Sequence, residues 1–218
     1  MNSKYIIMNL IGPEQSWGDR SPNRFKKTLR FPTKSGVVGM LCASLGIERE
    51  DTDKILEVNN SISMDTYVFS EGHIEDQRNT LTNGYKNYTD RMNQNGTPNN
   101  TIIITKSVLI GAAFSVIITS DENHAELFMN ALMDPILDIS LGRKQFSPSE
   151  EVFGGLCDSH QDAKNNMIET MSILGYNECK YSIHNATNIS EMDFVLYDEI
   201  IGSREFAPRF VTISYDVA

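Results

Sequence analysis

The chain has 218 residues, of which 40% are hydrophobic, and it carries a net charge of −10 with a sequence pI near 4.8. This length suits one large domain, or one domain with a sizeable insertion, and the composition allows a packed core. No run approaches the roughly 18 apolar residues that cross a membrane, and the start of the chain lacks the regions of a signal peptide.

The first part of the chain predicts a strand, a loop and a short helix. Residues 4–10 alternate apolar and polar side chains, as a strand does. Residues 12–34 are rich in Gly, Pro, Ser and basic residues, and we expect a long ordered loop, which inside a domain is usually functional. Ser35 is the expected N-cap of a following helix, and Gly46 its expected stop.

The middle of the chain combines strands with a polar segment. Residues 62–70 alternate like a strand. Residues 72–100 contain few aliphatic side chains and bury little surface, so we predict a projection, either a hairpin or a flexible arm. Residues 101–119 are strand-like with a break at 111–113, and residues 122–133 predict an amphipathic helix.

The last third predicts shorter elements. They are a Gly/Pro/Ser loop at 142–155, a helix at 161–174, and strands at 181–183, 194–197 and 210–215. Two βαβ-like stretches, 4–70 and 101–150, indicate an α+β fold with a ferredoxin-like body.

Positive charge is concentrated near the start of the chain. Residues 1–47 hold seven Lys or Arg against two acids, a net of +5, so the remaining 171 residues sum to −15. A basic site on an acidic body fits a protein that meets RNA on one face and proteins on others. The candidate phosphate contacts are Arg20, Arg24, Lys26, Lys27 and Arg30. The alternative is that these residues form a solvated charged loop.

Residues 31–36 lead into the predicted helix and suit a phosphate, because helix-start N–H groups would lie beside Lys34 and Ser35. The alternative is a turn and cap that only pack the helix. The Walker A order is absent, so nucleotide hydrolysis has no support. The single tryptophan, Trp17, is either a stacking platform for a base or a packing anchor.

Two further segments carry cations beside aromatic residues. The polar arm holds Arg78, Lys86 and Arg91, interleaved with tyrosines, and could clamp an RNA strand or form a surface loop. The loop at 141–146 offers Arg143, Lys144 and Gln145, and either grips RNA or merely connects elements.

No metal, cofactor or catalytic set is expected. The histidines, none in a metal-ligand spacing, are His73, His124, His160 and His184, and their polar surroundings predict surface positions. The cysteines are an odd count without a CxxC spacing, which favours a reduced cytoplasm. A histidine general base for RNA cleavage stays an open alternative.

Several of these segments together resemble a known family. Residues 12–18, 31–41 and 45–46 resemble the N-terminal signature of the CasD family, the type I-E form of the fifth CRISPR-associated protein, in the RAMP superfamily. Residues 141–148 resemble its second signature loop, and residues 204–211 resemble its C-terminal element. The chain departs from the family pattern with Lys106 where Arg is usual and Gly111 where an acid is usual.

The resemblance implies an RRM-like, ferredoxin-like body at residues 1–71 and 108–218, with a protruding β-hairpin thumb at 72–107. It implies a non-catalytic subunit of a Cascade-type surveillance complex in antiviral defence, which caps the 5′ handle of CRISPR RNA. The implied protein partners are the backbone subunit and the large PAM-reading subunit, with target DNA met only within the complex. RNA contact carries over to Lys34, Ser35, Arg78, Arg91, Lys106, Arg143 and Lys144.

Two alternatives remain open. The first is a metal-independent endoribonuclease that processes CRISPR repeat RNA, which needs a general base and a stabiliser of phosphate charge. The second is a ferredoxin-like module that binds only protein, against which the clustered N-terminal charge argues. Salt-dependent RNA binding separates that module from the other two hypotheses.

Overall fold

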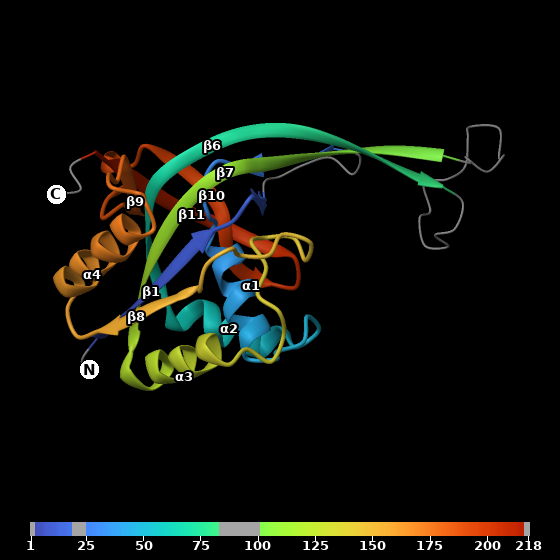
Figure 1. Ribbon diagram of the computed structural model, residues 1–218. Coiled ribbons are helices and arrows are strands. Elements are labelled where there is room, and N and C mark those ends of the chain that lie inside the picture. Colours follow the sequence, from blue (N-terminus) through green and yellow to red (C-terminus); the bar gives the residue numbers. More distant parts are fainter. Residues whose placement is uncertain (1–2, 19–24, 83–100, 216–218) are drawn as a thin grey trace.

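Most strands of the chain join one large sheet (Figure 1). A computed structural model describes residues 3–18, 25–82 and 101–215. The strands are β1 Ser3–Ile11, β2 Glu14–Gln15, β3 Trp17–Gly18, β4 Phe25–Lys26, β5 Thr28–Leu29, β6 Ser63–Thr82, β7 Thr101–Asp121, β8 Phe153–Cys157, β9 Tyr181–Asn185, β10 Phe194–Gly202 and β11 Glu205–Ser214. The helices are α1 Lys34–Ser44, α2 Thr52–Ser61, α3 Glu122–Met133 and α4 His160–Ile173, with a 3-10 turn at Ile189–Glu191.

The sheet is antiparallel along its main path, which runs β10-β11-β9-β6-β7-β1-β8. Two short strands lie off this path and pair with β7, β2 antiparallel and β4 parallel. A separate two-stranded sheet joins β3 to β5. The predicted combination of helices and strands is therefore confirmed, with the strands in a large antiparallel sheet.

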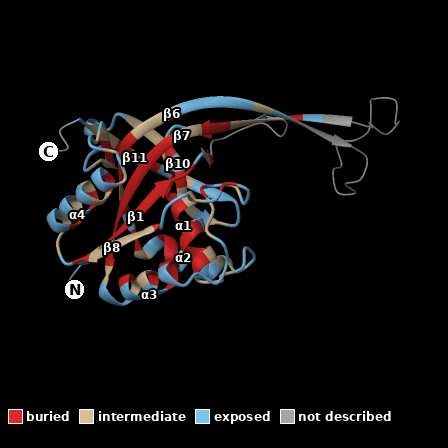
Figure 2. Cartoon of the chain, viewed as in Figure 1, coloured by how far each residue is buried: buried red, intermediate tan, exposed pale blue. Residues whose placement is uncertain are grey.

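Alternation along β1 divides its side chains between two cores. Ile6, Met8 and Leu10 pack in the larger core, together with residues of α1, α2 and α3. Ile7 and Ile11 pack in the smaller core with residues of α4. Because successive strand side chains point to opposite faces, this central strand is buried on both sides. Figure 2 shows the buried residues concentrated where the helices cover the sheet.

The helix boundaries follow local capping. The helix expected at 122–133 forms α3, where the Asp121 carboxylate accepts a 3.1 Å hydrogen bond from the His124 amide. The cap of α1 is Thr33, whose hydroxyl accepts from the Gly36 amide at 3.2 Å, so the prediction of Ser35 as N-cap was wrong by two residues. Helix α2 was not expected at all.

The strand predicted at 101–119 was expected to break at 111–113, but β7 runs without interruption. Its partner β6 shifts register between Val68 and Ser70 instead, and Gly111 adopts a φ of +67°. A Cβ on Gly72, at φ +61°, would lie 2.3 Å from the carbonyl oxygen of Ile110. These irregularities accompany the curve of the two long strands away from the helices (Figure 1). Residues 83–100, the outer part of the predicted projection, lie outside the described residues.

The segment at 12–34 was predicted as a loop, but its described residues contain four two-residue strands. Glu14 pairs in register with Ile110, and Lys26 pairs with Lys106. Strands β2 and β4 thus extend the sheet beyond the end of β1, beside the part of β7 in which Ile104 and Val108 are buried. The pairing partners lie far along the chain, so local sequence pattern does not reveal them.

Candidate nucleic-acid interface

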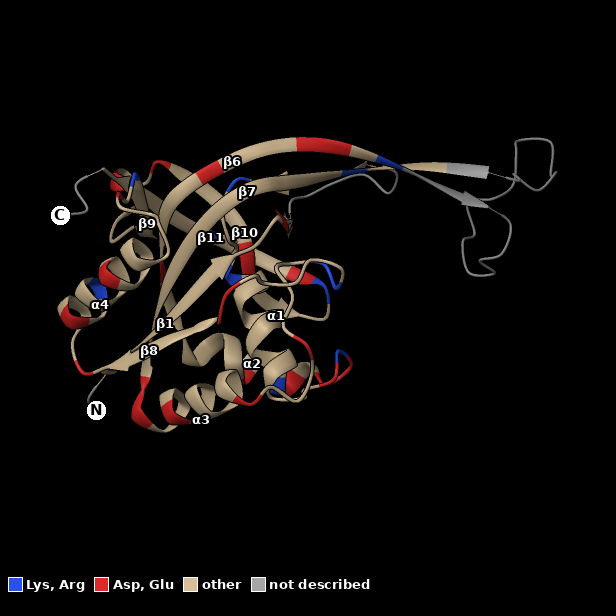
Figure 3. Cartoon of the chain, in the orientation of Figure 1, with Lys and Arg blue, Asp and Glu red and all other residues tan. Residues whose placement is uncertain are grey.

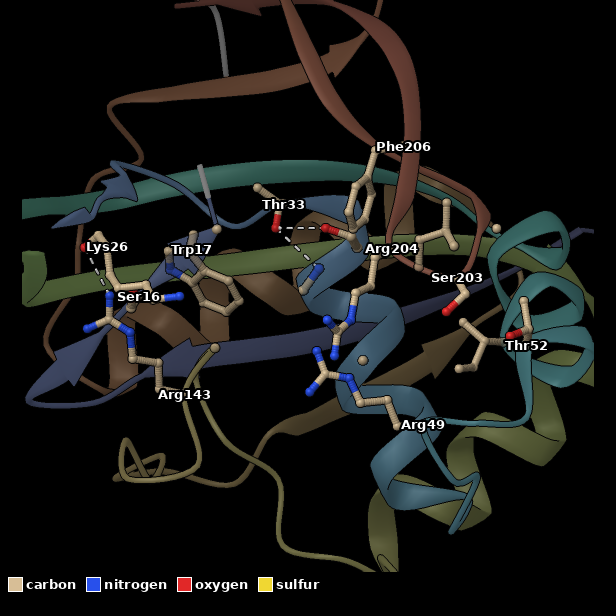
Figure 4. Close-up of a pocket in the computed structure, with 18 of the residues that line it drawn as sticks. Ser16, Trp17, Lys26, Thr33, Arg49, Thr52, Arg143, Ser203, Arg204 and Phe206 are labelled. Carbon is tan, nitrogen blue, oxygen red and sulfur yellow. Dashed lines mark hydrogen bonds between the residues drawn. The ribbon is translucent and has the colours of Figure 1, made fainter. Parts of the chain in front are cut away.

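An open groove of about 610 Å³ lies where six separate segments of the chain meet (Figure 4). The segments are Ser16 to Gly18, Lys26 and Lys27, the start of α1, residues 49–55, the loop at Gly142 and Arg143, and the β10–β11 turn. The sequence regions that resemble three family signatures therefore converge on one surface.

Positive charge dominates the groove. Glu50 is the one acid among its lining residues, and the cations are Lys26, Lys27, Arg49, Arg143 and Arg204. Arg49 and Arg204 extend toward the same part of the groove (Figure 4). Two guanidinium groups directed at a shared space repel each other unless an anion lies between them, so the groove favours a phosphate-bearing ligand.

Trp17 forms an inner wall of this groove and is itself buried. Its indole N–H donates to the Gln15 side chain at 3.0 Å, and its amide donates to the Thr28 hydroxyl at 2.8 Å. A Cβ on Gly36 would lie 3.0 Å from the ring, so this glycine lets the indole approach α1 closely. With 0% of its surface exposed, Trp17 acts as a packing anchor and presents no face on which a base can stack.

The loop after α3 is fixed against the first strands. The Ser16 amide donates to the Leu141 carbonyl at 3.0 Å, and the Leu141 amide donates to the Phe146 carbonyl at 2.7 Å. Gly142 has a φ of +92°, and a Cβ there would lie 1.7 Å from the Ser16 carbonyl oxygen. Only glycine fits this position, and the contact sets the place from which Arg143 enters the groove.

Arg143 is half-buried and incompletely paired. Its Nη2 donates to the Lys26 carbonyl at 3.2 Å, and its Cζ lies 5.8 Å from the centroid of the Phe146 ring. Its Nη1 is buried without an acceptor among the described residues. Burial lowers the pKa of Arg143, though an arginine in a protein keeps its charge. The charge of this guanidinium at the groove wall adds to the positive potential that attracts a phosphate.

The start of α1 is engaged by the protein itself. The Lys34 amide donates to Asp198 Oδ2 at 2.7 Å, and the Lys34 ammonium lies 2.7 Å from Glu199 Oε1. Asp198 is also held by Arg209, whose Nε and Nη2 lie 2.9 and 2.7 Å from its two oxygens. A carboxylate of β10 therefore occupies the place predicted for a phosphate, whereas Ser35 still lines the groove.

The remaining predicted contacts are distributed around the groove. Exposed but outside its lining are Arg30, Lys144 and Gln145. Arg78 and Lys106 lie on the long β6–β7 pair, and Lys106 pairs in register with Lys26 of the groove. The positions outside the described residues are Arg20, Arg24, Lys86 and Arg91.

Sequence reasoning missed three groove residues, Arg49, Arg204 and Phe206. Arg204 has a left-handed φ of +62° in the β10–β11 turn, and the Phe206 ring is 42% exposed beside it. A signal existed for these two, because residues 204–211 resemble the family's C-terminal element. No local pattern distinguishes Arg49 from other surface cations.

The comparisons with known proteins identify the family of the chain. The family model described as "CRISPR-associated protein (Cas_Cas5)" matches residues 5–212, nearly the whole chain. The chain belongs to this Cas5 family. It is 28% identical to the Cascade subunit CasD of Escherichia coli strain K12, over 94% of this chain and 93% of that protein.

Two solved structures resemble the Cas5 chain over most of its length. One, titled "CRISPR RNA-guided surveillance complex", has a TM-score of 0.72 and 21% identity, and covers 96% of this chain and 89% of that one. The other, titled "Crystal structure of Cas protein", has a TM-score of 0.67 and 25% identity, and covers 96% and 93% of the two chains. The fold is thus shared with CRISPR-associated proteins.

The histidines of the Cas5 chain lie outside the groove. His160 Nε2 and His184 Nδ1 flank the Asp65 carboxylate at 3.2 and 3.0 Å, and His124 lies 2.6 Å from Asp121. These three are half-buried beside carboxylates, whereas His73 is exposed, so the expected surface position is confirmed for His73 and holds only in part for the other three. Within the described ranges, no group of three or more His, Cys, Asp or Glu is placed to hold a metal ion. No helix in this part of the chain is long and apolar enough to cross a membrane.

Proposed function

We propose that this Cas5 chain is a non-catalytic subunit of a Cascade-type surveillance complex, and that its cationic groove holds the 5′ handle of CRISPR RNA. The observation that carries the proposal is the convergence of five Lys or Arg residues from distant segments on one groove with a single acid. The similarity to CasD, which is named as a Cascade subunit, supports the assembly part.

The groove suits the backbone of a single RNA strand. Its cations come from the N-terminal segment, the α1–α2 loop, the loop after α3 and the β10–β11 turn, and such contacts supply affinity without reading sequence. The exposed ring of Phe206 provides a surface on which one base can stack. Lys34 and Trp17 are not part of the proposed contact set, because the first is paired with Glu199 and the second is buried.

The long strands extend this surface. Lys106 of β7 lies opposite Lys26 of β4, and Arg78 is exposed on the neighbouring strand β6. We assign this pair of strands the part of a thumb that closes over the guide. The chain order β1–α1/α2–β6–β7–α3–β8, with the strands adjacent as β6-β7-β1-β8, supports a ferredoxin-like body. The proposed protein partners are the backbone subunit and the large PAM-reading subunit.

A non-catalytic role fits the side chains of the groove. RNA cleavage without a metal needs a general base near the attacked phosphate. None of the described histidines lines the groove, and Glu50 is its only carboxylate. The cations can hold a phosphate, but among the described residues no histidine is placed in the groove to remove a proton from a 2′-OH.

The test measures binding of labelled repeat-containing CRISPR RNA across a salt series, with a denaturing gel run in parallel. Five phosphate contacts on a single strand predict a slope of log K against log salt of about −3.5, and each lost contact removes about 0.7. Arg204→Ser and Arg143→Ser should each reduce the slope, whereas Lys164→Ser on α4, at the opposite face of the sheet, should not. A discrete cleavage product, or binding that ignores salt, would overturn the proposal.

A further inference from the structure

A second groove, of about 570 Å³, opens between α2 and α3 and shares no lining residue with the RNA groove. Its walls include Leu45, Ile47, Val58, Leu127 and Phe128. Val58 and Phe128 belong to the larger core, whereas Leu127 is 49% exposed, so the groove leads from solvent directly to the core. Nothing in the proposed RNA contacts uses this surface.

The apolar surface continues beyond the groove. Ile136 is 70% exposed and is held beside Gly46, where a Cβ would lie 2.8 Å from its Cγ2. The Ile136 amide donates to the Ser44 carbonyl at 3.0 Å, which fixes the position of this exposed side chain. Single exposed aliphatic residues are ordinary on a protein surface, but a groove continued by exposed aliphatic residues on its rim marks an interaction site.

The rim of this groove is acidic. Glu48, Asp51 and Glu57 line it against Lys54, whose ammonium is paired with Asp51 at 2.7 Å. Glu48 and Glu57, both exposed, therefore leave the rim negative. Figure 3 shows further acids on α3, a helix that contains no Lys or Arg. A phosphate backbone is repelled here, whereas a basic partner is attracted.

We propose that this groove docks an amphipathic helix of a partner protein, with aliphatic residues at i, i+3, i+4 and i+7 and Lys or Arg on its flanks. Such a helix buries its apolar stripe in the groove and places its cations against Glu48 and Glu57. A second copy of this chain fits poorly, because each described helix carries at most one Lys or Arg. The proposal rests on the proposed function in one respect, that the chain works inside an assembly.

The experiment titrates the full chain into a labelled synthetic helix of about 18 residues with that pattern of Leu and Lys. A matched peptide with Glu in place of Lys is the charge control. Leu127→Asp and the double variant Glu48→Lys/Glu57→Lys should each weaken binding by about tenfold or more. The matched variants Ile173→Asp and Glu169→Lys change an exposed isoleucine and an exposed glutamate of α4, and should leave binding unchanged.

Absence of binding to the basic peptide, or equal binding of the acidic peptide, overturns the proposal. Self-association of the chain that Leu127→Asp abolishes, measured by sedimentation, overturns it in favour of a second copy. The same variants are measured in the RNA salt series. Loss of peptide binding with intact RNA binding supports two separate surfaces, whereas peptide binding without any RNA binding refutes the handle proposal alone.

Discussion

Replacing Asp198 by alanine should destabilise the protein far more than removing an exposed carboxylate. Asp198 is 3% exposed and accepts hydrogen bonds from Nε and Nη2 of Arg209 and from the Lys34 amide. In Asp198→Ala the Arg209 guanidinium, in a residue that is 8% exposed, keeps only the Asn185 side chain at 3.0 Å. The variant therefore leaves a buried charge without its counter-charge and removes the partner of a helix-start amide.

Breaking a buried ion pair from one side costs roughly 3–5 kcal/mol, against a total free energy of unfolding of roughly 5–15 kcal/mol. For a chain of this length, the unfolding midpoint should fall by roughly 6–20 °C. Thermal and urea unfolding followed by circular dichroism measures the loss. Asp158→Ala, which removes an 85% exposed partner of Lys4, is the matched control and should leave the midpoint nearly unchanged.

A double variant separates the charge from the packing. Asp198→Ala with Arg209→Met removes both charges, and should recover part of the stability lost in the single variant. If Asp198→Ala costs no more than Asp158→Ala, the pair does not hold β10 and β11 to α1, and the argument about the helix start fails.

Further predictions concern two glycines and the three thiols. Gly142→Ala should lower the free energy of unfolding by more than about 2 kcal/mol, because φ is +92° and the added Cβ would meet the Ser16 carbonyl. Gly39→Ala, at an exposed helix position with open space around it, should raise the free energy of unfolding by about 0.5–1 kcal/mol; chemical denaturation of both variants measures the two effects. Burial raises the pKa of the thiols of Cys42 and Cys179 to about 11 and also raises that of Cys157. Iodoacetamide at pH 8 should therefore label the three thiols slowly in the native chain and fully in urea, as measured by mass spectrometry.

The sequence predicted elements best where the signal is local. Helix α3 has its cap, its apolar spacing and its end within a dozen residues, and it was predicted with the observed boundaries. Helix α2 was missed because Asn59 and Asn60 interrupt its apolar pattern, and Asn59 is needed there to donate to Glu199 and Ile200. Tertiary contacts of Asn59, more than the helix propensity of the segment, therefore account for the formation of α2.

The candidate site was predictable in part for the same reason. Basic residues of the N-terminal segment and Arg143 could be identified from composition and loop context, and the structure brings Lys26, Lys27 and Arg143 together. Lys34 carries the same local signal, yet it is paired with Glu199, 165 residues away along the chain. A cation can bind RNA only if no carboxylate of the protein is already paired with it. A carboxylate so far along the chain cannot be identified from the local sequence around the cation.

Strand β7 has a consequence for synthesis. It pairs with β1, β2, β4 and β6, and the register joins Ser3 to Asp121 and Ile11 to Ala113. At ribosomal rates of roughly 5–20 residues per second, β1 therefore waits roughly 5–20 s after it is made before its partner strand is complete. Until then the apolar residues of β1 have neither strand partner nor core, so the nascent chain passes through an aggregation-prone interval in which chaperones matter most.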